Sequence, residues 1–412
     1  MSERKKFIYL VAAFLAAYLV PFSHPRVAAG ISEAFFMLQE YAREHVLFCL
    51  IPAFFIAGGI AVFVNQASVI KYFGAEAKRV LAYGVASVSG SVLAVCSCTV
   101  LPLFTGIYQR GAGIGPATAF LYSGPAINVL AIILTARVLG FEMGLARALG
   151  AVVFSIVIGL AMAAIFRKED TQRLSALGVQ TGQIERRRRL WQDLVYFACM
   201  VAILVFAAWG KPSEPVGFWN AVYGVKWYLV ALSLLLLLLA LRRWFEKDEL
   251  KDWVRETYGF SLLIMPLLFA GVLAAGFLLG RPGHEALIPS RYVEAAVGAG
   301  PEQFFALTGI EPGLLSDIVS VVWPVWTCFF ASIAAAFMYF ATLTEVPILQ
   351  ALLGAGMAKG PALSLLLAGP AVSLPSMLVI RGVLGTKKTL VYVALIVSMA
   401  TLTGLAYGYL GS

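Results

Sequence analysis

The sequence has little charge and almost no histidine. Only 13% of its 412 residues are charged, 61% are hydrophobic, and the mean hydropathy is +0.87. Soluble domains carry about 25% charged residues, so a water-soluble globular protein is excluded and the lipid bilayer must be the solvent. The three histidines, His24, His45 and His284, lie in predicted loops or at span ends. A haem- or quinone-binding subunit of a redox complex needs histidines within its spans, which disfavours that class.

Cysteine is scarce as well, and each cysteine lies within or beside an apolar segment. This placement does not fit the disulfide framework of an extracellular domain. The net charge of +9 comes from basic residues clustered in short loops between apolar segments. Such loops orient a membrane protein, so no nucleic-acid partner is expected. The cysteines are Cys49, Cys96, Cys98, Cys199 and Cys328.

Apolar runs divide the chain into predicted membrane spans, each near the length of about 20 residues that a spanning helix needs. Two further apolar stretches, 81–107 and 326–352, are ambiguous. The first twenty residues also have the layout of a signal peptide, but the repeat described below favours an uncleaved first span. The spans lie near residues 7–22, 46–64, 114–138, 143–166, 191–209, 225–243, 261–280, 361–384 and 389–410.

Basic loops orient these spans. The four consecutive arginines Arg186–Arg189 and a second basic cluster at 242–255 mark the cytoplasmic side, together with the basic amino terminus. All of them lie on one side only if the stretch 81–107 enters and leaves the membrane on the same side. We therefore predict a re-entrant hairpin there and, by the repeat described next, a second one at 326–352.

An internal repeat relates the two halves of the chain at a constant shift of 245 residues (360 − 115), without a gap from Pro102 to Gly140. Two ungapped Gly-Pro-Ala triplets recur, which chance explains poorly. The matches include Gly115-Pro116-Ala117 with Gly360-Pro361-Ala362, Gly124-Pro125-Ala126 with Gly369-Pro370-Ala371, and Val138-Leu139-Gly140 with Val383-Leu384-Gly385.

The predicted fold class is all-α: a polytopic transmembrane helical transporter with inverted repeats, about nine spans and two re-entrant hairpins. The basic loops give paired spans opposite directions, which makes the repeats inverted. Inverted repeats with broken helices near the midplane are typical of secondary transporters, so we expect a permease and not an enzyme. The expected units are 1–166 as the first repeat, 167–190 as a basic cytoplasmic loop, 191–209 as a linker span and 225–412 as the second, inverted repeat.

The turn of the first hairpin carries Cys96-Ser97-Cys98-Thr99. Residues two apart on a continuous helix point about 200° apart, but in an unwound segment both sulfurs can face one soft ion. The pair therefore indicates a thiophilic substrate, with Cys96 and Cys98 as metalloid ligands. The alternative is that both thiols pack as small hydrophobic groups, and their spacing does not separate the two. Cys328 is a candidate third sulfur, although packing is the better explanation for it.

The run CSCTVLPLFTGIYQRGAGIGPATAFLYSGPAINVLA, residues 96–131, resembles the signature of a predicted permease family (UPF0718-like) that includes the ArsP-type organoarsenical efflux permeases. The resemblance implies efflux of trivalent arsenicals, whether methylated, aromatic or inorganic. The second repeat departs from the pattern, since Leu343-Thr344-Glu345 stands where the first has Cys98-Thr99-Val100. The positions that match the family signature are Cys96, Cys98, Pro102, Gly124, Pro125 and Asn128.

Polar residues near the predicted helix breaks complete the candidate site. Glu345 is an intramembrane carboxylate, which is costly and indicates a proton carrier; a capping or interfacial carboxyl is the alternative. Asn128 and Ser373 are equivalent in the repeat, as are Thr99 and Thr344, and each could bind substrate or satisfy carbonyls freed by a proline. The predicted breaks are at Pro102, Gly124, Pro125, Gly369 and Pro370.

These observations predict a multi-pass permease of the cell (inner) membrane that exports trivalent arsenicals through a thiol-lined, alternating-access site with proton coupling. The serious rival is a permease for another soft or sulfur-containing small solute, because no residue separates the two. The expected partners are the lipid bilayer, a small-molecule or metalloid substrate and protons. No cofactor is implied.

Overall fold

The computed structural model describes residues 18–64, 78–93, 97–179, 190–207, 217–281, 283–309, 314–337, 345–354 and 356–410, with residues 7, 10, 11, 14, 15, 69, 73 and 209. Within this part of the chain the regular structure is helical and contains no β-strand; one isolated antiparallel bridge joins Gly298 to Met357. The prediction of an all-α fold is confirmed.

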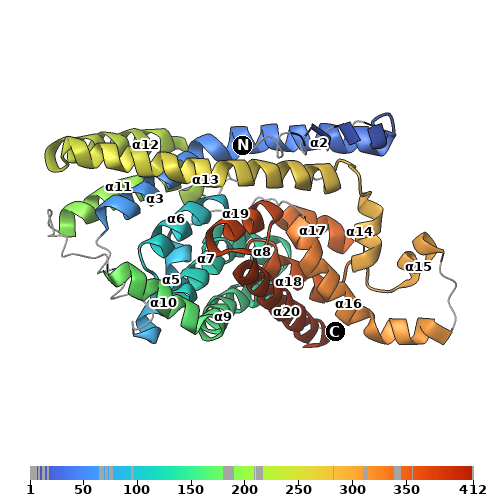
Figure 1. The fold of residues 1–412 in the computed structure, drawn as a ribbon. Helices are drawn as coiled ribbons and strands as arrows, with labels where there is room; N and C mark the ends of the chain where they lie inside the picture. Colours follow the sequence, from blue (N-terminus) through green and yellow to red (C-terminus); the bar gives the residue numbers. More distant parts are fainter. Residues whose placement is uncertain are drawn as a thin grey trace.

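The described helices follow one another along the chain as Figure 1 shows. In the first half these are α2 (Pro25–Tyr41), a π-helix (Ala42–Leu50), α3 (Ile51–Phe63), α5 (Arg79–Leu93), α6 (Ser97–Gln109), α7 (Ile114–Ala126), α8 (Val129–Val138), α9 (Phe141–Ile165) and α10 (Arg167–Val179). The second half has α11 (Leu190–Ala207), α12 (Gly217–Trp244), α13 (Lys247–Leu279), α14 (Ser290–Val297), α15 (Glu302–Thr308), α16 (Leu314–Phe337), α17 (Glu345–Gly354), α18 (Lys359–Ala368), α19 (Leu374–Leu384) and α20 (Thr386–Leu410).

Five of the described helices are long and apolar enough to cross a membrane: α9, α13 and α20, with most of α12 and α16. A sixth span results if α7 and α8, which meet at a bend of 46°, are counted together. The remaining apolar helices, α3, α11, α18 and α19, are shorter. These helices support a polytopic membrane protein. The count of nine spans stays a prediction, because several predicted spans consist of two short helices.

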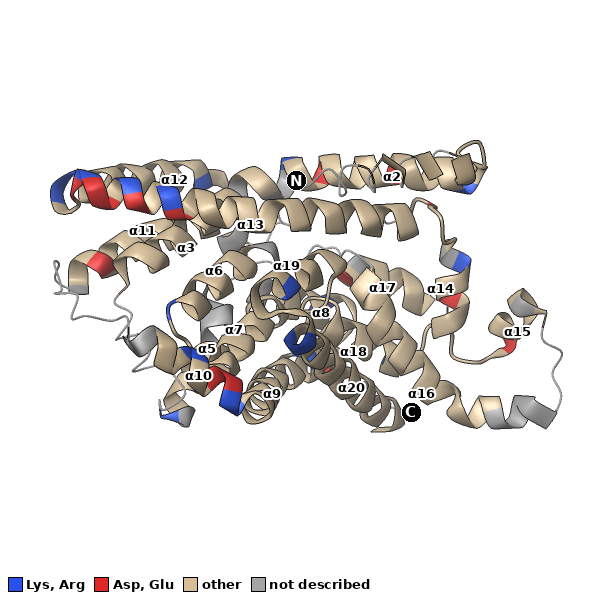
Figure 2. Cartoon of the chain, in the orientation of Figure 1, with Lys and Arg blue, Asp and Glu red and all other residues tan. Residues whose placement is uncertain are grey.

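Charged residues lie mainly at the ends of the long helices (Figure 2). Lys and Arg gather where α12 ends and α13 begins, and around α10, whereas the middle of α13 has no charge. This separation is typical of helices whose central turns face lipid, since a charge at the bilayer centre costs several kcal/mol.

The two copies of the repeat run in opposite directions. A shift of 245 residues takes the bounds of α9, Phe141–Ile165, to those of α20, Thr386–Leu410. The carboxyl end of α9 leads directly into α10, while the amino end of α20 reaches α10 through Lys388, whose Nζ lies 3.3 Å from Glu169 Oε2. The two helices contact each other. They are therefore antiparallel, as an inverted repeat requires.

The two helices of the predicted first hairpin, α5 and α6, begin and end at the same end of the molecule. Tyr83, near the start of α5, donates a hydrogen bond to the Gly159 carbonyl, near the carboxyl end of α9 (3.3 Å). Arg173 of α10 donates to the Tyr108 carbonyl at the end of α6 (2.7 Å). The start of α5 thus lies beside the last turns of α9 and the end of α6 lies beside α10, at the same end of the molecule, as the predicted re-entrant element requires.

Paired glycines bring the central helices together in both repeats. A Cβ at Gly159 would lie 2.8 Å from the Gly115 carbonyl oxygen, and one at the equivalent Gly404 would lie 2.6 Å from that of Gly360. Only glycine permits such close backbone approach, a common device in membrane helix packing. α7 is buried along its whole length and α18 from its second residue on, so these two helices form the centre of the molecule.

Candidate functional site

A buried ion pair joins the two repeats at the centre of the molecule. Arg147 of α9 and Glu345, the first residue of α17, have no solvent-exposed surface, and Arg147 Nη2 donates to Glu345 Oε1. Arg147 Nη1 donates to Thr135 Oγ1 on α8 (2.9 Å), and this hydroxyl in turn donates to the Ala131 carbonyl (2.6 Å). A guanidinium and a carboxylate can both stay charged in a fully buried position only because each neutralises the other.

The pair is incompletely hydrogen-bonded. Arg147 Nε and Glu345 Oε2 are both buried and have no hydrogen-bond partner among the described residues. A buried polar atom without a partner costs about 1–3 kcal/mol. Sites that retain this cost are frequently functional, so the pair is the strongest candidate for the chemistry of the protein.

The two repeats also meet through equivalent residues. Tyr122 of α7 donates its hydroxyl hydrogen to the Leu367 carbonyl of α18 (2.9 Å), and these two positions are 245 residues apart. A contact between equivalent positions must lie near the axis that relates the two copies. Tyr122 also lies within electrostatic reach of Arg147, Glu345 and Tyr392. The ion pair is therefore close to the centre of the inverted repeat.

Of these two residues, Glu345 is predicted from the sequence to belong to the site, whereas Arg147 is not. The signal was present, because Arg147 is a charge inside the predicted span 143–166. Its partner lies 198 residues away, on the other repeat. No local pattern pairs residues at that separation, so only the packing of α9 against the second repeat brings them together.

Asn128 and Ser373 occupy equivalent places at the start of the second short helix of each broken pair. Asn128 is buried at the bend between α7 and α8, and its carbonyl accepts from the Ile132 amide (3.0 Å). Ser373 is the N-cap of α19, where its Oγ accepts from the Ser376 amide (3.4 Å) and contacts the Ser376 hydroxyl (2.7 Å). Ser373 therefore caps the amino end of α19, where it satisfies an amide N–H rather than a carbonyl freed by a proline.

The proline-containing motifs lie differently in the two copies. Pro102 is inside α6 and does not end it, which departs from the break predicted there. Gly124 and Pro125 are in the last turn of α7, and the chain bends two or three residues later. In the second copy α18 ends before Gly369 and Pro370, so the break falls on the motif itself. A proline near a helix end removes few internal hydrogen bonds, so Pro125 is tolerated in the last turn of α7.

The soft-ligand hypothesis concerns residues largely outside the described part of the chain. Cys96 and Thr344 are outside it, as is the side chain of Cys98, while Thr99 is buried in the first turn of α6. Cys328 is buried in the position equivalent to Tyr83, and a Cβ at Gly360 would lie 3.5 Å from its sulfur. Packing between α16 and α18 accounts for this thiol.

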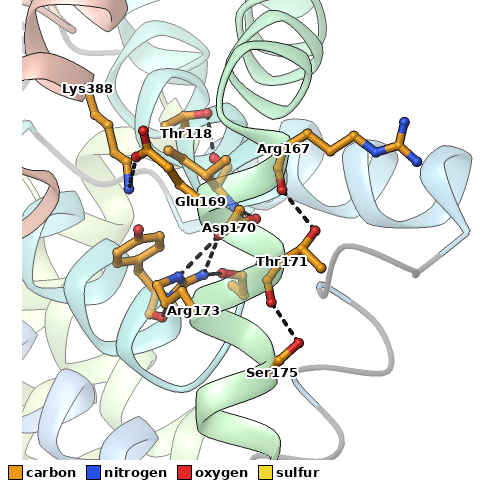
Figure 3. Close-up of polar contacts among 11 residues, drawn as sticks. Thr118, Arg167, Glu169, Asp170, Thr171, Arg173, Ser175 and Lys388 are labelled. Atoms are coloured by element: carbon orange, nitrogen blue, oxygen red, sulfur yellow. Dashed lines mark hydrogen bonds and ion pairs between the residues drawn. The ribbon is translucent and has the colours of Figure 1, made fainter.

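A cluster of polar contacts surrounds α10 (Figure 3). Asp170 Oδ2 accepts from the Ile114 amide at the start of α7 (2.8 Å), which satisfies a free N–H of that helix. Arg173 donates to Asp170 and to the carbonyls of Tyr108 and Ala112. A hydrogen bond from Lys388 lowers the pKa of the exposed Glu169 carboxyl. α10 therefore links the first hairpin, α7 and the second repeat.

The protein is all-α, its two repeats are antiparallel, and a charged pair is buried between them. This architecture is typical of transporters. Comparison with known proteins agrees. Residues 32–409 match the ArsP_1 family, described as a predicted permease. The chain is 41% identical over 372 residues to the UPF0718 protein MJ0584 of Methanocaldococcus jannaschii, which covers 90% of this chain and 93% of that protein. No solved structure matches. The chain belongs to this family of predicted permeases.

Proposed function

We propose that this permease exports small trivalent arsenicals across the cell membrane, with Cys96 and Cys98 as soft ligands and Glu345 as the proton carrier. The support for arsenic comes from the Cys-Ser-Cys motif, because thiolates bind trivalent arsenic and lie here at the turn of a predicted re-entrant hairpin. Asn128 and Thr99, both buried near helix ends, are the proposed polar contacts from the first repeat, with Thr344 and Ser373 from the second.

The observation that carries proton coupling is the burial of Glu345 against Arg147 at the junction of the repeats. A carboxylate in this position can take up a proton only when its contact with the guanidinium loosens. Alternating access changes how the two repeats pack, and so changes this contact. Protonation of Glu345 and rearrangement of the repeats are then linked steps.

Resistance of cells without their own arsenic efflux pumps tests the substrate. Cells that express the protein should grow in methylated trivalent arsenicals or arsenite. The Cys96→Ser/Cys98→Ser variant should lose this growth at equal membrane expression. Cys199→Ser is the matched control, since this buried thiol of α11 is outside the proposed site. Full resistance in the double-serine variant would return both thiols to a packing role and leave the arsenical proposal without support.

A further inference from the structure

The Arg147 guanidinium makes one hydrogen bond to the Glu345 carboxylate, although a guanidinium can make two parallel ones to such a group. In a guanidinium, Nε–H and one Nη2–H point from the same edge and match the two oxygens of an acid group. At Arg147 the carboxylate contacts Nη2 through Oε1, while Nε and Oε2 have no partner among the described residues. Within the described part of the chain, the Nε–H of this edge therefore makes no hydrogen bond.

A second, partly exposed ion pair of the same protein makes both hydrogen bonds. Arg281 Nε donates to Glu33 Oε2 (2.9 Å) and Arg281 Nη2 donates to Glu33 Oε1 (3.1 Å), so both carboxylate oxygens occupy the edge. That pair joins α2 to the end of α13 and makes the two parallel hydrogen bonds of a structural ion pair. The Arg147 pair differs in this respect.

We propose that the Nε/Nη2 edge of Arg147 is a binding subsite for a small monovalent anion with acid oxygens, and that Glu345 occupies this edge until it takes up a proton. The proposal rests on transport by this chain and is independent of arsenic. An entering acid group makes both hydrogen bonds of the edge, and the neutral Glu345 carboxyl becomes a donor to the anion. Arg147 stays charged throughout.

Charge balance determines the coupling. In the empty site one guanidinium and one carboxylate sum to zero, and an anion added to this pair would leave a net negative charge in the membrane interior. A net charge in the membrane interior has a high free-energy cost. Binding of the anion must therefore be accompanied by protonation of Glu345. With Glu345 neutral, the guanidinium and the anion again sum to zero. One proton therefore moves with each monovalent anion, and the cycle transfers no net charge.

Among the described residues around the pair, Glu345 is the one acidic group. Tyr122 and Tyr392 are the titratable residues of α7 and α20 at this depth, and both are neutral when protonated. The helices packed against α17 carry Arg137 near the end of α8 and Lys359 at the start of α18, and both are exposed. Within the described part of the chain, Glu345 is thus the acidic group that faces Arg147.

Anion binding to the purified, full-length protein tests the proposal. The probe is 2-mercaptoethanesulfonate, a permanently ionised monoanion with a thiol, and 2-mercaptoethanol is its uncharged counterpart. Because binding takes up one proton, the Kd of the sulfonate should rise about tenfold per pH unit where Glu345 is ionised in the empty protein. In Glu345→Gln the Kd should be independent of pH. A pH-independent Kd in the wild type, or no sulfonate binding, would overturn the proposal.

The variant Arg147→Gln/Glu345→Gln removes both charges and leaves no lone buried ion. It should weaken sulfonate binding at least about tenfold, the magnitude expected for two hydrogen bonds to a charged group. The control is Glu33→Gln/Arg281→Gln, which deletes the partly exposed pair between α2 and the end of α13 and should bind the sulfonate as the wild type does. Equal loss in both double variants would assign the effect to protein stability and reject the subsite.

Proteoliposomes with an internal pH dye complete the test. Sulfonate uptake should acidify the interior by about one proton per anion and should not respond to an imposed membrane potential. Failure of arsenical resistance with this uptake intact would reject the proposed substrate and keep the subsite. Resistance that survives Arg147→Gln/Glu345→Gln, in a protein that does not bind the sulfonate, would reject the subsite and keep arsenical export.

Discussion

Arg147 and Tyr392 occupy equivalent positions of α9 and α20, 245 residues apart, and both are fully buried. One repeat places a charge there and the other a phenol. The partner of Arg147, Glu345, is likewise equivalent to Val100 in the first repeat. The backbone is therefore repeated while the charge is present in one copy only. A symmetric pair of ion pairs would bury four charges, and the observed arrangement buries two.

Removing one charge of the central pair should be more harmful than removing both. Glu345→Leu leaves the Arg147 guanidinium buried without a counter-ion, which costs about 3–5 kcal/mol in other proteins. Arg147→Met/Glu345→Leu replaces both groups with apolar side chains and should recover most of this loss. Thermal unfolding in detergent measures both variants. A double variant no more stable than Glu345→Leu would show that the pair contributes through something other than charge balance.

The paired glycines should be intolerant of even one methyl group. Gly159→Ala and Gly404→Ala each place a Cβ within 2.8 Å of a backbone carbonyl oxygen of the neighbouring helix, so the helices must separate. We expect a loss of about 1–3 kcal/mol for each. Gly259→Ala is the control, because nothing lies within 4 Å of its added Cβ, and it should stabilise α13 by up to about 1 kcal/mol. Equal unfolding temperatures in all three variants would contradict the close packing.

Labelling of introduced cysteines with a membrane-impermeant maleimide on intact cells measures the orientation of the chain in the membrane. Ser175 on α10 and Tyr409 at the end of α20 are both exposed. Ser175→Cys should stay unlabelled until the cells are opened, because α10 precedes the basic loop. Tyr409→Cys should react from outside, since α20 starts beside α10 and is about 37 Å long. Labelling of both cysteines from the same side would exclude the proposed topology.

The contact between α10 and α20 should depend on pH in one direction. Because Lys388 lowers the pKa of Glu169 below its usual value of 4.5, the carboxylate contributes at neutral pH. A group with a depressed pKa loses its contribution as the pH falls through that pKa, so the coupling should disappear only below pH 4.5. A double-mutant cycle with Glu169→Gln and Lys388→Met, repeated at several pH values, measures this coupling. Coupling that instead weakens between pH 6 and 8 would assign the contact to a different group.

The sequence by itself determined that this protein lies in a lipid bilayer and that its helices repeat along the chain. Long apolar runs with charge confined to the loops require a bilayer, because no soluble domain could bury that much apolar surface. The constant shift of 245 residues predicts equivalent helices, and the bounds of α9 and α20 agree with it to the residue. The apolar runs and the internal repeat are both patterns in the order of residues along the chain, so a single sequence is enough to detect them.

Only the tertiary structure decided which residues share a site. Arg147 and Glu345 are 198 residues apart on different repeats, and Cys328 has its sulfur beside Gly360 because α16 packs on α18. Pro102 resembles a helix breaker in the sequence, but α6 continues through it, whereas α7 ends one residue after Pro125. Side-chain pairing across a membrane bundle depends on how whole helices cross, and the free energy of that crossing is summed over many contacts that no short motif records.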